Sequence, residues 1–567
     1  MLSSSPLFGP VGPFLPLLFA AGLALLGFAW ARMTLLLARM LQIEEYEWRR
    51  LVLWSIHSRW FLSVPALAGA LVTVAGVFLM WNGLLVHGAL LAVPLLVGDV
   101  VLLVLFHPLP AKKALVYTPR MRRLLAAAAG IGLMLLAVVF FLEYQHGHLE
   151  EQGYLLAVPV LLSPLAAVLI LLTALALTEP LERYYRRGFI LRAGRRLEQI
   201  GCRVVAVAGS YGKTSTKGMV AHVLELLGPA YPTPHSFNTL LGVTRAINET
   251  LPEGTRTFVV EMDAYRGGEI SRICSLVKPE MAVVTAVGPQ HLERFGSMEA
   301  VVGSLAETTA LLPKDGVAVV YGGEEPSSDS DPAFFKWQRE LVERAGAGGV
   351  RLVVYGSERT PGAVARAENV RLSPRGTAFR FRWRAEGLDV PVETPLLGRH
   401  QAENGCAALV VAHLLGVDVG QAAHRLSTMK QVEHRLQVLP GATGVTVIDD
   451  SYNANPVGVH NGLEVLEQFG SGQKILVTPG IVELGEREEE ENRKYGAHAA
   501  RVCDHLILVR SRAAMAMGRG IDQEESKAVT HLVGSLSEAQ DIIRTVTRAG
   551  DVIMFANDLP DTYMGIH

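Results

Sequence analysis

The residue types best suited to chemistry stand in a short glycine-rich stretch, Gly209–Thr216, which reads Gly-Ser-Tyr-Gly-Lys-Thr-Ser-Thr. The β-branched run Arg203–Ala208 precedes it, and a helical pattern from about Lys217 follows it. Backbone N–H groups of a glycine-rich turn at the start of a helix form a cradle for phosphate oxygens. Lys213 supplies a positive charge for the terminal phosphates, and the Thr214 hydroxyl suits the accompanying Mg²⁺. The stretch therefore predicts a binding site for a nucleoside triphosphate.

The elements that position this stretch belong to an alternating pattern of strands and helices after residue 200. Such alternation predicts parallel α/β sheets. The strand-like runs are Arg203–Ala208, Thr257–Glu261, Met281–Val287, Gly316–Val320, Val445–Asp449, Lys474–Thr478, His505–Val509 and Asp551–Phe555. Closely spaced strands in 349–392 predict a small antiparallel insertion. Because ligands gather at the carboxyl ends of parallel strands, we expect Glu261 and His291 beside the phosphate loop.

Several motifs resemble those of the Mur ligase family, in the same order along the chain. Gly209–Lys217 has the family form G-[T/S]-x-G-K-T-[S/T]-x-K, with Val207 where the commoner phosphate-loop pattern has its first glycine. The other similar segments are Ser236–Val243 (family form [F/L]-N-N-x-x-G-x-P), Phe258–Ala264 with Gly268–Ile270 (E-x-G-A…G-[E/D]-I), His291–Ser297 (H-L-E-x-F-G-S), Gly398–Asn404 (G-x-H-N-x-x-N) and Glu433–Arg435 ([G/H]-R). Ile448–Pro456 contains D-D-S-Y-N-A-N-P residue for residue, which is a highly specific match.

The resemblance implies a reaction, its cofactors and its residues. Mur ligases use ATP to phosphorylate a carboxylate, and an amine then displaces phosphate from the acyl phosphate. By resemblance, Thr214, Glu261 and His291 hold Mg²⁺, and Arg435 reaches the terminal phosphates because its guanidinium fork suits phosphate oxygens. Asp450 would accept hydrogen bonds from the ribose, and Asn404 would contact the base or that face of the site. The implied catalytic residues are Lys213, Glu261, His291 and Arg435. The implied nucleotide-binding residues are Gly209, Ser210, Tyr211, Gly212, Lys213, Thr214, Ser215, Asn404, Arg435 and Asp450.

The chain departs from the family pattern in three places. Leu305 stands where several members carry a carbamoylated lysine, and Glu307 is the candidate to replace that ligand. Phe555–Pro560 replaces the C-terminal K-G-S-R element, which indicates a changed amino-acceptor pocket. The usual N-terminal UDP-sugar domain is missing, and apolar segments occupy its place.

The first third of the chain is strongly apolar. Of the 567 residues, 50% are hydrophobic and 19% charged, with a mean hydropathy of +0.29, which excludes a disordered chain. The net charge of −2 excludes a global basic field for nucleic acid, and four widely spaced cysteines exclude a disulfide framework or a zinc site. Five runs have membrane-spanning length. They are Val11–Ala31, Trp60–Trp81, Leu84–Phe106, Leu124–Leu142 and Tyr154–Leu177.

The charges between these runs predict their orientation. Arginine- and lysine-rich segments alternate with segments that carry neither residue. The positive-inside rule then places the N-terminus outside and everything after residue 178 in the cytoplasm. The stretch Arg183–Arg196 lies against anionic headgroups or forms an ordinary solvated helix.

These observations predict a transmembrane bundle of about five helices followed by an α/β Mur ligase. The expected parts are a transmembrane domain (1–180), an Arg-rich juxtamembrane linker (181–200), a central ATP-binding domain (201–434) and a Rossmann-like C-terminal domain (435–567). We expect a multi-pass inner (plasma) membrane ligase for cell-envelope peptides, with an N-terminus outside and cytoplasmic ligase domains. Its expected partners are the bilayer, a lipid-linked or polymeric acceptor, and an amino acid or short peptide, but no nucleic acid. A poly-γ-glutamate-type polyamide synthase and a catalytically inactive ATP-binding regulatory protein remain open as alternatives.

Overall fold

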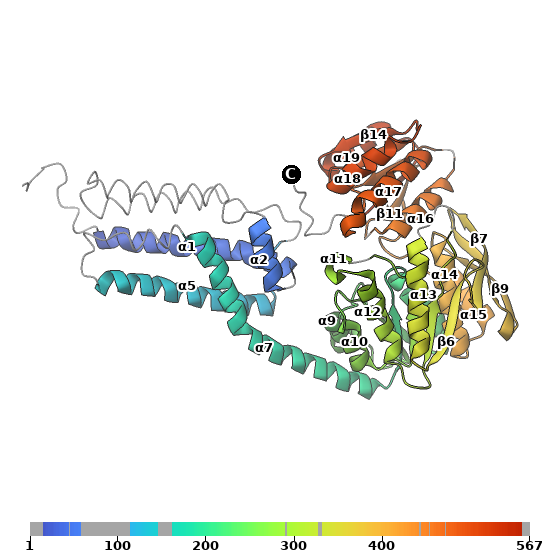
Figure 1. Ribbon diagram of the computed structural model, residues 1–567, viewed down its shortest axis with the longest axis horizontal. Helices are drawn as coiled ribbons and strands as arrows, with labels where there is room; N and C mark the ends of the chain where they lie inside the picture. Colours follow the sequence, from blue (N-terminus) through green and yellow to red (C-terminus); the bar gives the residue numbers. More distant parts are fainter. Residues whose placement is uncertain are drawn as a thin grey trace, which may run out of the picture. The chain divides into compact units, whose positions relative to one another are not determined.

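The computed structural model describes residues 15–44, 46–57, 114–145, 162–289, 292–326, 332–441, 444–452, 454–470, 472–482 and 484–557 (Figure 1). The chain divides between Arg187 and Gly188 into an N-terminal helical unit and a larger α/β unit.

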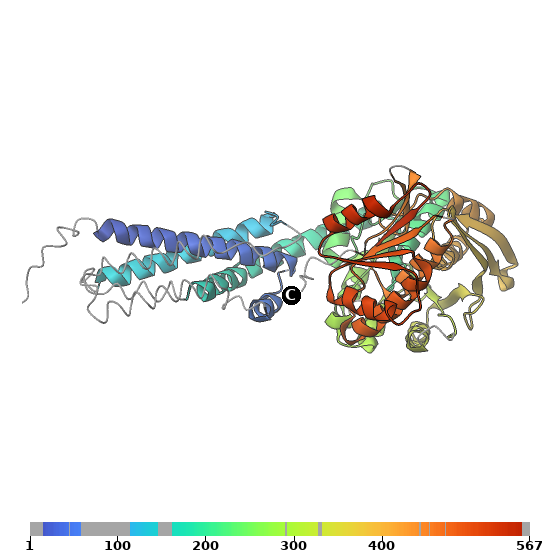
Figure 2. The ribbon, with the colours of Figure 1, turned by 90° about the horizontal axis from the view of Figure 1, so that it is seen from above.

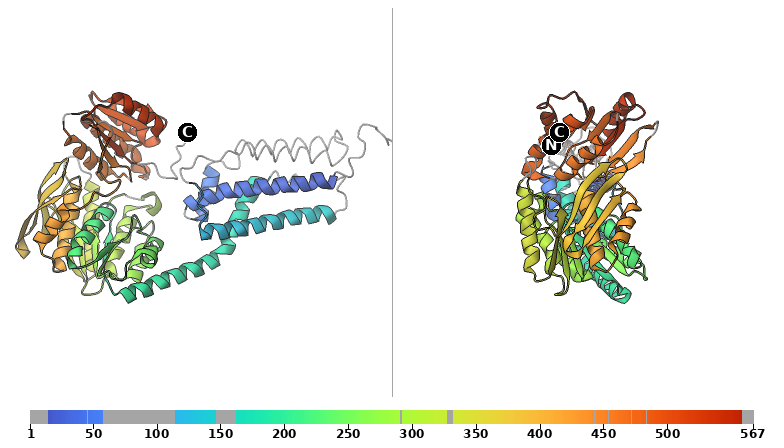
Figure 3. Two further views of the ribbon diagram at one scale, coloured as in Figure 1. Left: turned by 180° about the vertical axis from the view of Figure 1, so that it is seen from behind. Right: turned by 90° about the vertical axis from the view of Figure 1, so that its right-hand side faces the viewer.

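Long apolar helices build the N-terminal unit. They are α1 (Leu15–Ile43), α5 (Pro119–Gln145) and α7 (Ser163–Ile200). A shorter helix, α2 (Trp48–His57), follows α1. α1 and α5 run side by side (Figure 3). The shared core includes Leu26, Met33, Leu37, Leu41, Met121 and Leu124. Trp30 of α1 donates a hydrogen bond to the hydroxyl of Ser163, 3.1 Å away at the start of α7.

Three segments of these helices are long and apolar enough to cross a membrane: Leu23–Ile43, Pro119–Leu142 and Ser163–Ile200. They overlap the first, fourth and fifth predicted spans. The second and third predicted spans, 60–81 and 84–106, lie outside the described residues, so the count of five stays a prediction. α1 continues through Ile43 instead of ending near Ala31, because the residues that follow are mostly strong helix formers. Arg32 and Arg39 therefore lie within a helix and not in the predicted loop.

α7 joins the fifth predicted span to the Arg-rich linker without a break. Pro180 lies inside it, where proline removes one backbone donor from the helix ladder. Two ion pairs tie α5 to α7 on either side of this proline. Arg123 contacts Glu182 at 2.6 Å, and Arg120 contacts Glu179 at 3.6 Å.

One nine-stranded sheet forms the first half of the α/β unit, in the order β2-β3-β1-β4-β5-β6-β7-β8-β9. The parallel strands are β2 (Ala230–Pro232), β3 (Thr257–Glu261), β1 (Arg203–Ala208), β4 (Met281–Val284), β5 (Val317–Tyr321) and β6 (Arg351–Ser357). The antiparallel strands predicted within 349–392 are present as β7 (Ala365–Ser373), β8 (Gly376–Trp383) and β9 (Leu388–Thr394). Because β7 pairs with β6, these strands extend the central sheet and do not form a separate sheet.

Helices cover both faces of this sheet. Because side chains of a strand point alternately to its two faces, β1 contributes residues to both cores. Val205 and Val207 share a core with α8 (Lys213–Leu224), α14 (His400–Leu414) and α15 (Val419–Ser427). Val204, Ala206 and Ala208 share the other core with residues of α10 (Glu269–Val277), α12 (Met298–Ala310) and α13 (Pro332–Ala347). The short helices α9 (Leu240–Arg245) and α11 (Leu292–Phe295) complete this half.

A six-stranded sheet forms the second half, in the order β10-β11-β15-β12-β13-β14 (Figure 2). Its strands are β10 (Gln437–Pro440), β11 (Thr446–Asp450), β15 (Val552–Ala556), β12 (Lys474–Thr478), β13 (His505–Val509) and β14 (Val529–Val533), and only β10 pairs in the antiparallel sense. α16 (Pro456–Glu467), α17 (Glu488–Val502) and α18 (Arg512–Ile521) pack on one face, and α19 (Leu536–Val546) packs on the other. The predicted alternation of strands and helices is therefore present in both halves.

Candidate active site

The predicted phosphate loop lies at the carboxyl end of β1 and leads into the first turn of α8. Gly209 and Gly212 have φ angles of +144° and +82°, which favour glycine at both positions. A Cβ atom on Gly212 would lie 2.7 Å from Oδ1 of Asn404. The two glycines therefore let the loop turn tightly and pack closely on its neighbours, Thr285 at Gly209 and Asn404 at Gly212, and backbone N–H groups of such a turn at a helix start can bind phosphate oxygens.

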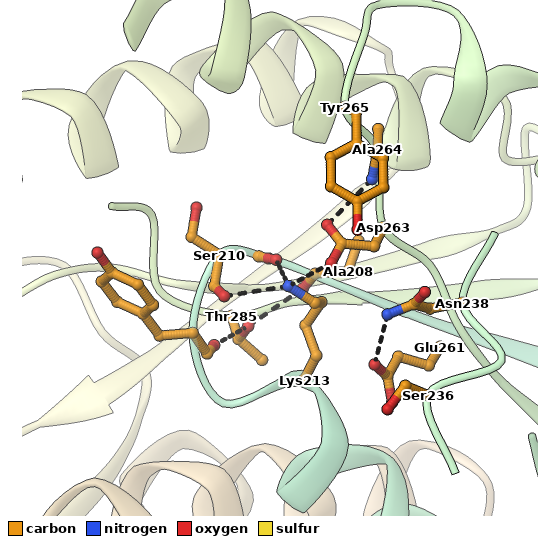
Figure 4. A network of polar contacts seen from close by, with 12 residues as sticks. Ala208, Ser210, Lys213, Ser236, Asn238, Glu261, Asp263, Ala264, Tyr265 and Thr285 are labelled. Atoms are coloured by element: carbon orange, nitrogen blue, oxygen red, sulfur yellow. Dashed lines mark hydrogen bonds and ion pairs between the residues drawn. The ribbon is translucent and has the colours of Figure 1, made fainter. Parts of the chain in front are cut away.

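Lys213 is held inside this loop (Figure 4). Its Nζ donates to the carbonyl oxygens of Gly209 at 2.7 Å and Ser210 at 3.0 Å. The same ammonium lies 3.2 Å from Oδ2 of Asp263, a residue just beyond the end of β3. Both charged side chains are largely buried, so the ion pair is shielded from solvent.

A second lysine follows one turn later on α8. Lys217 lies 2.9 Å from Oε2 of Glu261 and donates to the carbonyl of His235 at 2.7 Å. Glu261, the last residue of β3, is 1% exposed, and its Oε1 accepts a hydrogen bond from Asn238 at 3.1 Å (Figure 4). The two lysines of α8 therefore face two carboxylates from the end of β3.

Tyr211 is the one large residue of the loop. Its backbone carbonyl accepts from the Thr285 hydroxyl at 2.5 Å, and its ring packs flat against Gly288. A Cβ atom on Gly288 would lie 2.1 Å from Cε2 of Tyr211. The absence of a side chain at residue 288 therefore makes room for this tyrosine.

Asn404 joins α14 to α8 beneath the loop. Its Oδ1 accepts from the Thr216 hydroxyl at 3.0 Å, and its Nδ2 donates to Gln401 at 3.1 Å. The neighbouring Glu403 accepts from the Tyr321 hydroxyl at 3.0 Å. Burial and, to a lesser extent, the charge of Glu324 raise the pKa of Glu403 to about 8, and the Tyr321 hydrogen bond opposes this shift. Burial and the charge of Arg435 lower the pKa of His400 to about 4.

A cleft of about 1630 Å³ opens at the carboxyl ends of both sheets. Ten of the residues predicted for the site line it: Ser210, Tyr211, Gly212, Lys213, Thr214, Ser215, Glu261, Asn404, Arg435 and Asp450. Gly209 lies in the loop behind them. His291, the other predicted metal ligand, lies outside the described residues.

The second sheet contributes a different set of contacts to this cleft. The Arg435 guanidinium lies 4.4 Å from the ring centre of Tyr452, and Tyr452 shares a short hydrogen bond with Ser236. The backbone N–H of Leu436 donates to Asp450 at 3.2 Å. Burial raises the pKa of Asp450 to about 7, and the charge of Arg435 opposes this shift.

Asn557 fixes the loops at this end of the second sheet. It has a φ of +65°, its Nδ2 donates to the carbonyl of Gly480 at 2.6 Å, and its Oδ1 accepts from the N–H of Ala454 at 3.1 Å. Asn557 belongs to the segment that departs from the family's K-G-S-R element. That departure was visible in the sequence, but the two bonds were not.

Glu307 does not lie at the cleft. Its carboxylate accepts from the backbone N–H groups of Gly268 at 2.6 Å and Ser271 at 2.9 Å, and from the Ser271 hydroxyl at 2.8 Å. It therefore caps the start of α10, and the expectation that it replaces a carbamate ligand is wrong. Within the described ranges, no group of three His, Cys, Asp or Glu side chains is placed to hold a metal ion.

The donors at the cleft fit a triphosphate with a hard cation. The open backbone cradle and Lys213 suit phosphate oxygens, and the Thr214 hydroxyl and Glu261 carboxylate are oxygen ligands of the kind that Mg²⁺ prefers.

Comparison with known proteins agrees with this geometry. The Mur ligase middle domain matches residues 207–412, and the Mur ligase glutamate ligase domain matches residues 434–557. The UDP-N-acetylmuramoyl-tripeptide–D-alanyl-D-alanine ligase of Mycobacterium leprae is 32% identical over 385 residues, covering 62% of this chain and 70% of that protein. The chain belongs to the Mur ligase family.

Other members of the family extend the comparison. The same ligase from Bacillus subtilis is 28% identical over 364 residues, covering 63% of this chain and 74% of that protein. MurF from Acinetobacter baumannii has a TM-score of 0.56 at 26% identity, covering 66% and 77% of the two chains. MurF ligase from Thermotoga maritima, solved in complex with ADP, has a TM-score of 0.54 at 25% identity, covering 66% and 81%.

These relatives confirm the prediction of an ATP-dependent, ADP-forming acid–amino-acid ligase of the Mur type. They give no support to the two alternatives, a polyamide synthase or an inactive regulatory protein. Asp263 was missed by the sequence analysis, although its signal was present. It stands where the family run E-x-G-A has glycine.

Proposed function

We propose that this Mur ligase is a membrane-anchored enzyme of cell-envelope peptide synthesis that joins a carboxylate to an amine through an acyl phosphate. The observation that carries the proposal is the cleft, which has Lys213 on one side and Arg435 and Asp450 on the other. The relatives named above act, by their names, on UDP-N-acetylmuramoyl-tripeptide and D-alanyl-D-alanine. Their names support a peptide carboxylate and a short peptide amine as the two substrate classes.

The proposed nucleotide is ATP, and the ADP complex of the Thermotoga maritima relative supports it. The loop Gly209–Ser215 holds the phosphates, with Lys213 and Arg435 neutralising the terminal ones. Asp450 accepts hydrogen bonds from the ribose, and Asn404 supports the wall on the side of the base. Holding both reactants in one enclosed cleft supplies much of the rate through orientation.

Thr214, Glu261 and His291 are the proposed residues for Mg²⁺. Hydroxyl, carboxylate and imidazole ligands suit this role, and the Mur motif beginning at His291 supports the third of them. When bound, the cation neutralises charge on the phosphate that is transferred. The guanidinium of Arg435 contacts the ring of Tyr452, and this contact orients the planar group before substrate binds.

The N-terminal helices anchor the enzyme in the bilayer with the ligase domains on the cytoplasmic side. Three segments of sufficient length and apolarity support the anchoring, and the distribution of Arg and Lys supports the orientation. A ligase at the membrane has direct access to a lipid-linked or polymeric acceptor, and this is the substrate carrier that we propose.

The test uses full-length protein purified in detergent, with ATP and Mg²⁺. Release of ADP is measured with a tripeptide carried on UDP-sugar or on a lipid, each with and without D-alanyl-D-alanine. We expect ADP release only when carboxylate and amine are both present, and a product whose mass equals their sum less one water. ATP binding without stimulation by any acceptor contradicts the proposal and favours a regulator. Stimulation by glutamate alone, with polymer formation, contradicts it in favour of a polyamide synthase.

A further inference from the structure

The two lysine–carboxylate pairs beside the phosphate loop differ in how firmly they are held. Lys217 and Glu261 are 6% and 2% exposed and lie 2.9 Å apart, and each has a further hydrogen-bond partner, the carbonyl of His235 and the amide of Asn238. This pair is locked in the structure. Removing either member would leave a buried charge alone, which is costly.

Asp263 is bound more loosely to Lys213. Its side chain is 13% exposed, and Oδ2 lies 3.2 Å from Lys213 (Figure 4). Within the part of the chain that the structure describes, Oδ1 accepts a single hydrogen bond, from the adjacent backbone N–H of Ala264 at 3.0 Å. Both residues line the cleft. Asp263 can therefore lose Lys213 to a phosphate without becoming a fully buried, uncompensated charge.

On the side away from Lys213, the described residues that line a small pocket with Asp263 carry no charge. On its second side, Asp263 lines a small pocket with loop residues and a wall of α11 and α12. The other residues of this pocket are Gly209, Ser210, Ala264, Phe295, Val301, Ser304 and Leu305, none of which is ionisable. When Lys213 moves from Asp263 to a phosphate, the Asp263 carboxylate lies next to phosphate oxygens, and the described residues of this pocket supply no charge to neutralise it.

A carboxylate and a phosphate that lie side by side repel each other. A divalent cation that prefers oxygen ligands relieves this repulsion by binding oxygens of both groups. We propose that Asp263 makes nucleotide binding conditional on the divalent cation: it holds Lys213 while the loop is empty and exchanges it for the cation when the nucleotide enters. This inference rests on the nucleotide binding proposed above. In this role Asp263 couples binding of the nucleotide to binding of the cation. Glycine, which the family run has at this position, has no side chain for it.

The test measures ADP binding by calorimetry, with full-length protein in detergent, in EDTA and in saturating Mg²⁺. For the natural protein we expect Mg²⁺ to tighten ADP binding strongly. Asp263→Asn keeps the shape of the side chain but removes its charge. It should tighten ADP binding in EDTA and weaken it in Mg²⁺, so that the enhancement by Mg²⁺ shrinks by about 10-fold or more. Asp315→Asn, in an exposed turn of the same domain, is the matched control and should leave both affinities unchanged.

A second measurement separates the cation from the lysine. Binding of Mn²⁺ to the protein–ADP complex, followed by electron paramagnetic resonance, should weaken in Asp263→Asn. In a Lys213→Ala background, the gain in EDTA should shrink because there is no lysine to release, but it should not vanish, because Asp263 still repels the phosphates; the loss of Mn²⁺ affinity should remain. Asp263→Ser gives an independent variant should the asparagine protein fail to fold, as judged by its thermal melt.

The outcomes are distinguishable. Equal changes of ADP affinity in EDTA and Mg²⁺, or no change in either, overturn the role of Asp263 while leaving the nucleotide site in place. Failure of the natural protein to bind ADP with Mg²⁺ overturns the proposed function itself.

Discussion

The two sheets present polar side chains to the same cleft by different means. At the end of the central sheet, Lys213 and Lys217 are buried and paired with Asp263 and Glu261, so charge fixes the side chains. At the end of the second sheet, backbone and amide hydrogen bonds around Asn557 and Asp450 fix the loops. We infer that the first side serves the phosphates and their cation, and that the second side, beyond the proposed contacts of Arg435 and Asp450 with the nucleotide, positions the other substrate.

The largest effect should come from the charged side. Lys213→Ala removes the cation of the phosphate loop and should lower acceptor-dependent ADP release by about 100-fold or more. The measurement is the steady-state rate with both substrates present. Lys278→Ala removes a lysine from an exposed pair with Glu198 and should leave the rate unchanged. A retained rate in Lys213→Ala would remove the phosphate-loop assignment and, with it, the contrast between the two sides.

Substitutions at Asn557, on the hydrogen-bonded side, should lower the stability of the protein and weaken binding of the acceptor. Asn557→Gly keeps the positive φ but loses both side-chain bonds, and should destabilise the protein by about 1–3 kcal/mol. Asn557→Ala should cost about 1 kcal/mol more, because alanine is strained at this φ. Thermal melting checks both values.

The same variants sharpen the comparison in steady-state kinetics. We expect Asn557→Gly to raise the KM of the amino acceptor while the KM of ATP stays close to that of the natural protein. An equal rise in both would show that Asn557 does not act on the acceptor alone.

A third effect should be a pH dependence of stability at Glu403, on the wall beside the phosphate loop; it leaves catalysis aside and tests one side chain. Its pKa is about 8 in the folded protein and about 4.3 in an unfolded chain. Between these values the folded state binds a proton that the unfolded state releases, so this residue makes stability fall as pH rises. Glu403→Gln should melt at a higher temperature than the natural protein at pH 8, and this difference should shrink towards pH 5. Glu340→Gln, at an exposed pair on α13, is the control, and a difference that does not vary with pH would argue against a protonated Glu403.

The sequence predicted the loop and the strand ends that meet it, because local features define both. Gly209–Lys217 carries its own turn-forming glycines, and Glu261 ends a short run of β-branched and aromatic residues. Parallel strands then bring such ends together whatever the intervening loops contain. The role of each residue stays a prediction, as does everything assigned to His291.

Other features depend on contacts that spacing along the chain does not reveal. Nothing near Glu307 predicts that it caps α10, because its partners Gly268 and Ser271 lie more than thirty residues away. The pairing of Asp263 with Lys213 likewise requires the register of β3 against β1. In the N-terminal unit, hydropathy located the apolar segments but not the ends of the helices, since α1 and α7 continue through arginines that the charge rule assigns to loops.

The packing of Tyr211 against Gly288 restricts which residues can occur together at positions 211 and 288. The ring and any side chain at residue 288 compete for one volume, so the two positions cannot change independently. A chain that gains even a methyl group at 288 must have a smaller residue at 211, turn the Tyr211 ring away, or shift the loop that carries Lys213. In close relatives, a large residue at 211 should therefore occur with glycine at 288, and a small residue at 211 should occur with a side chain at 288.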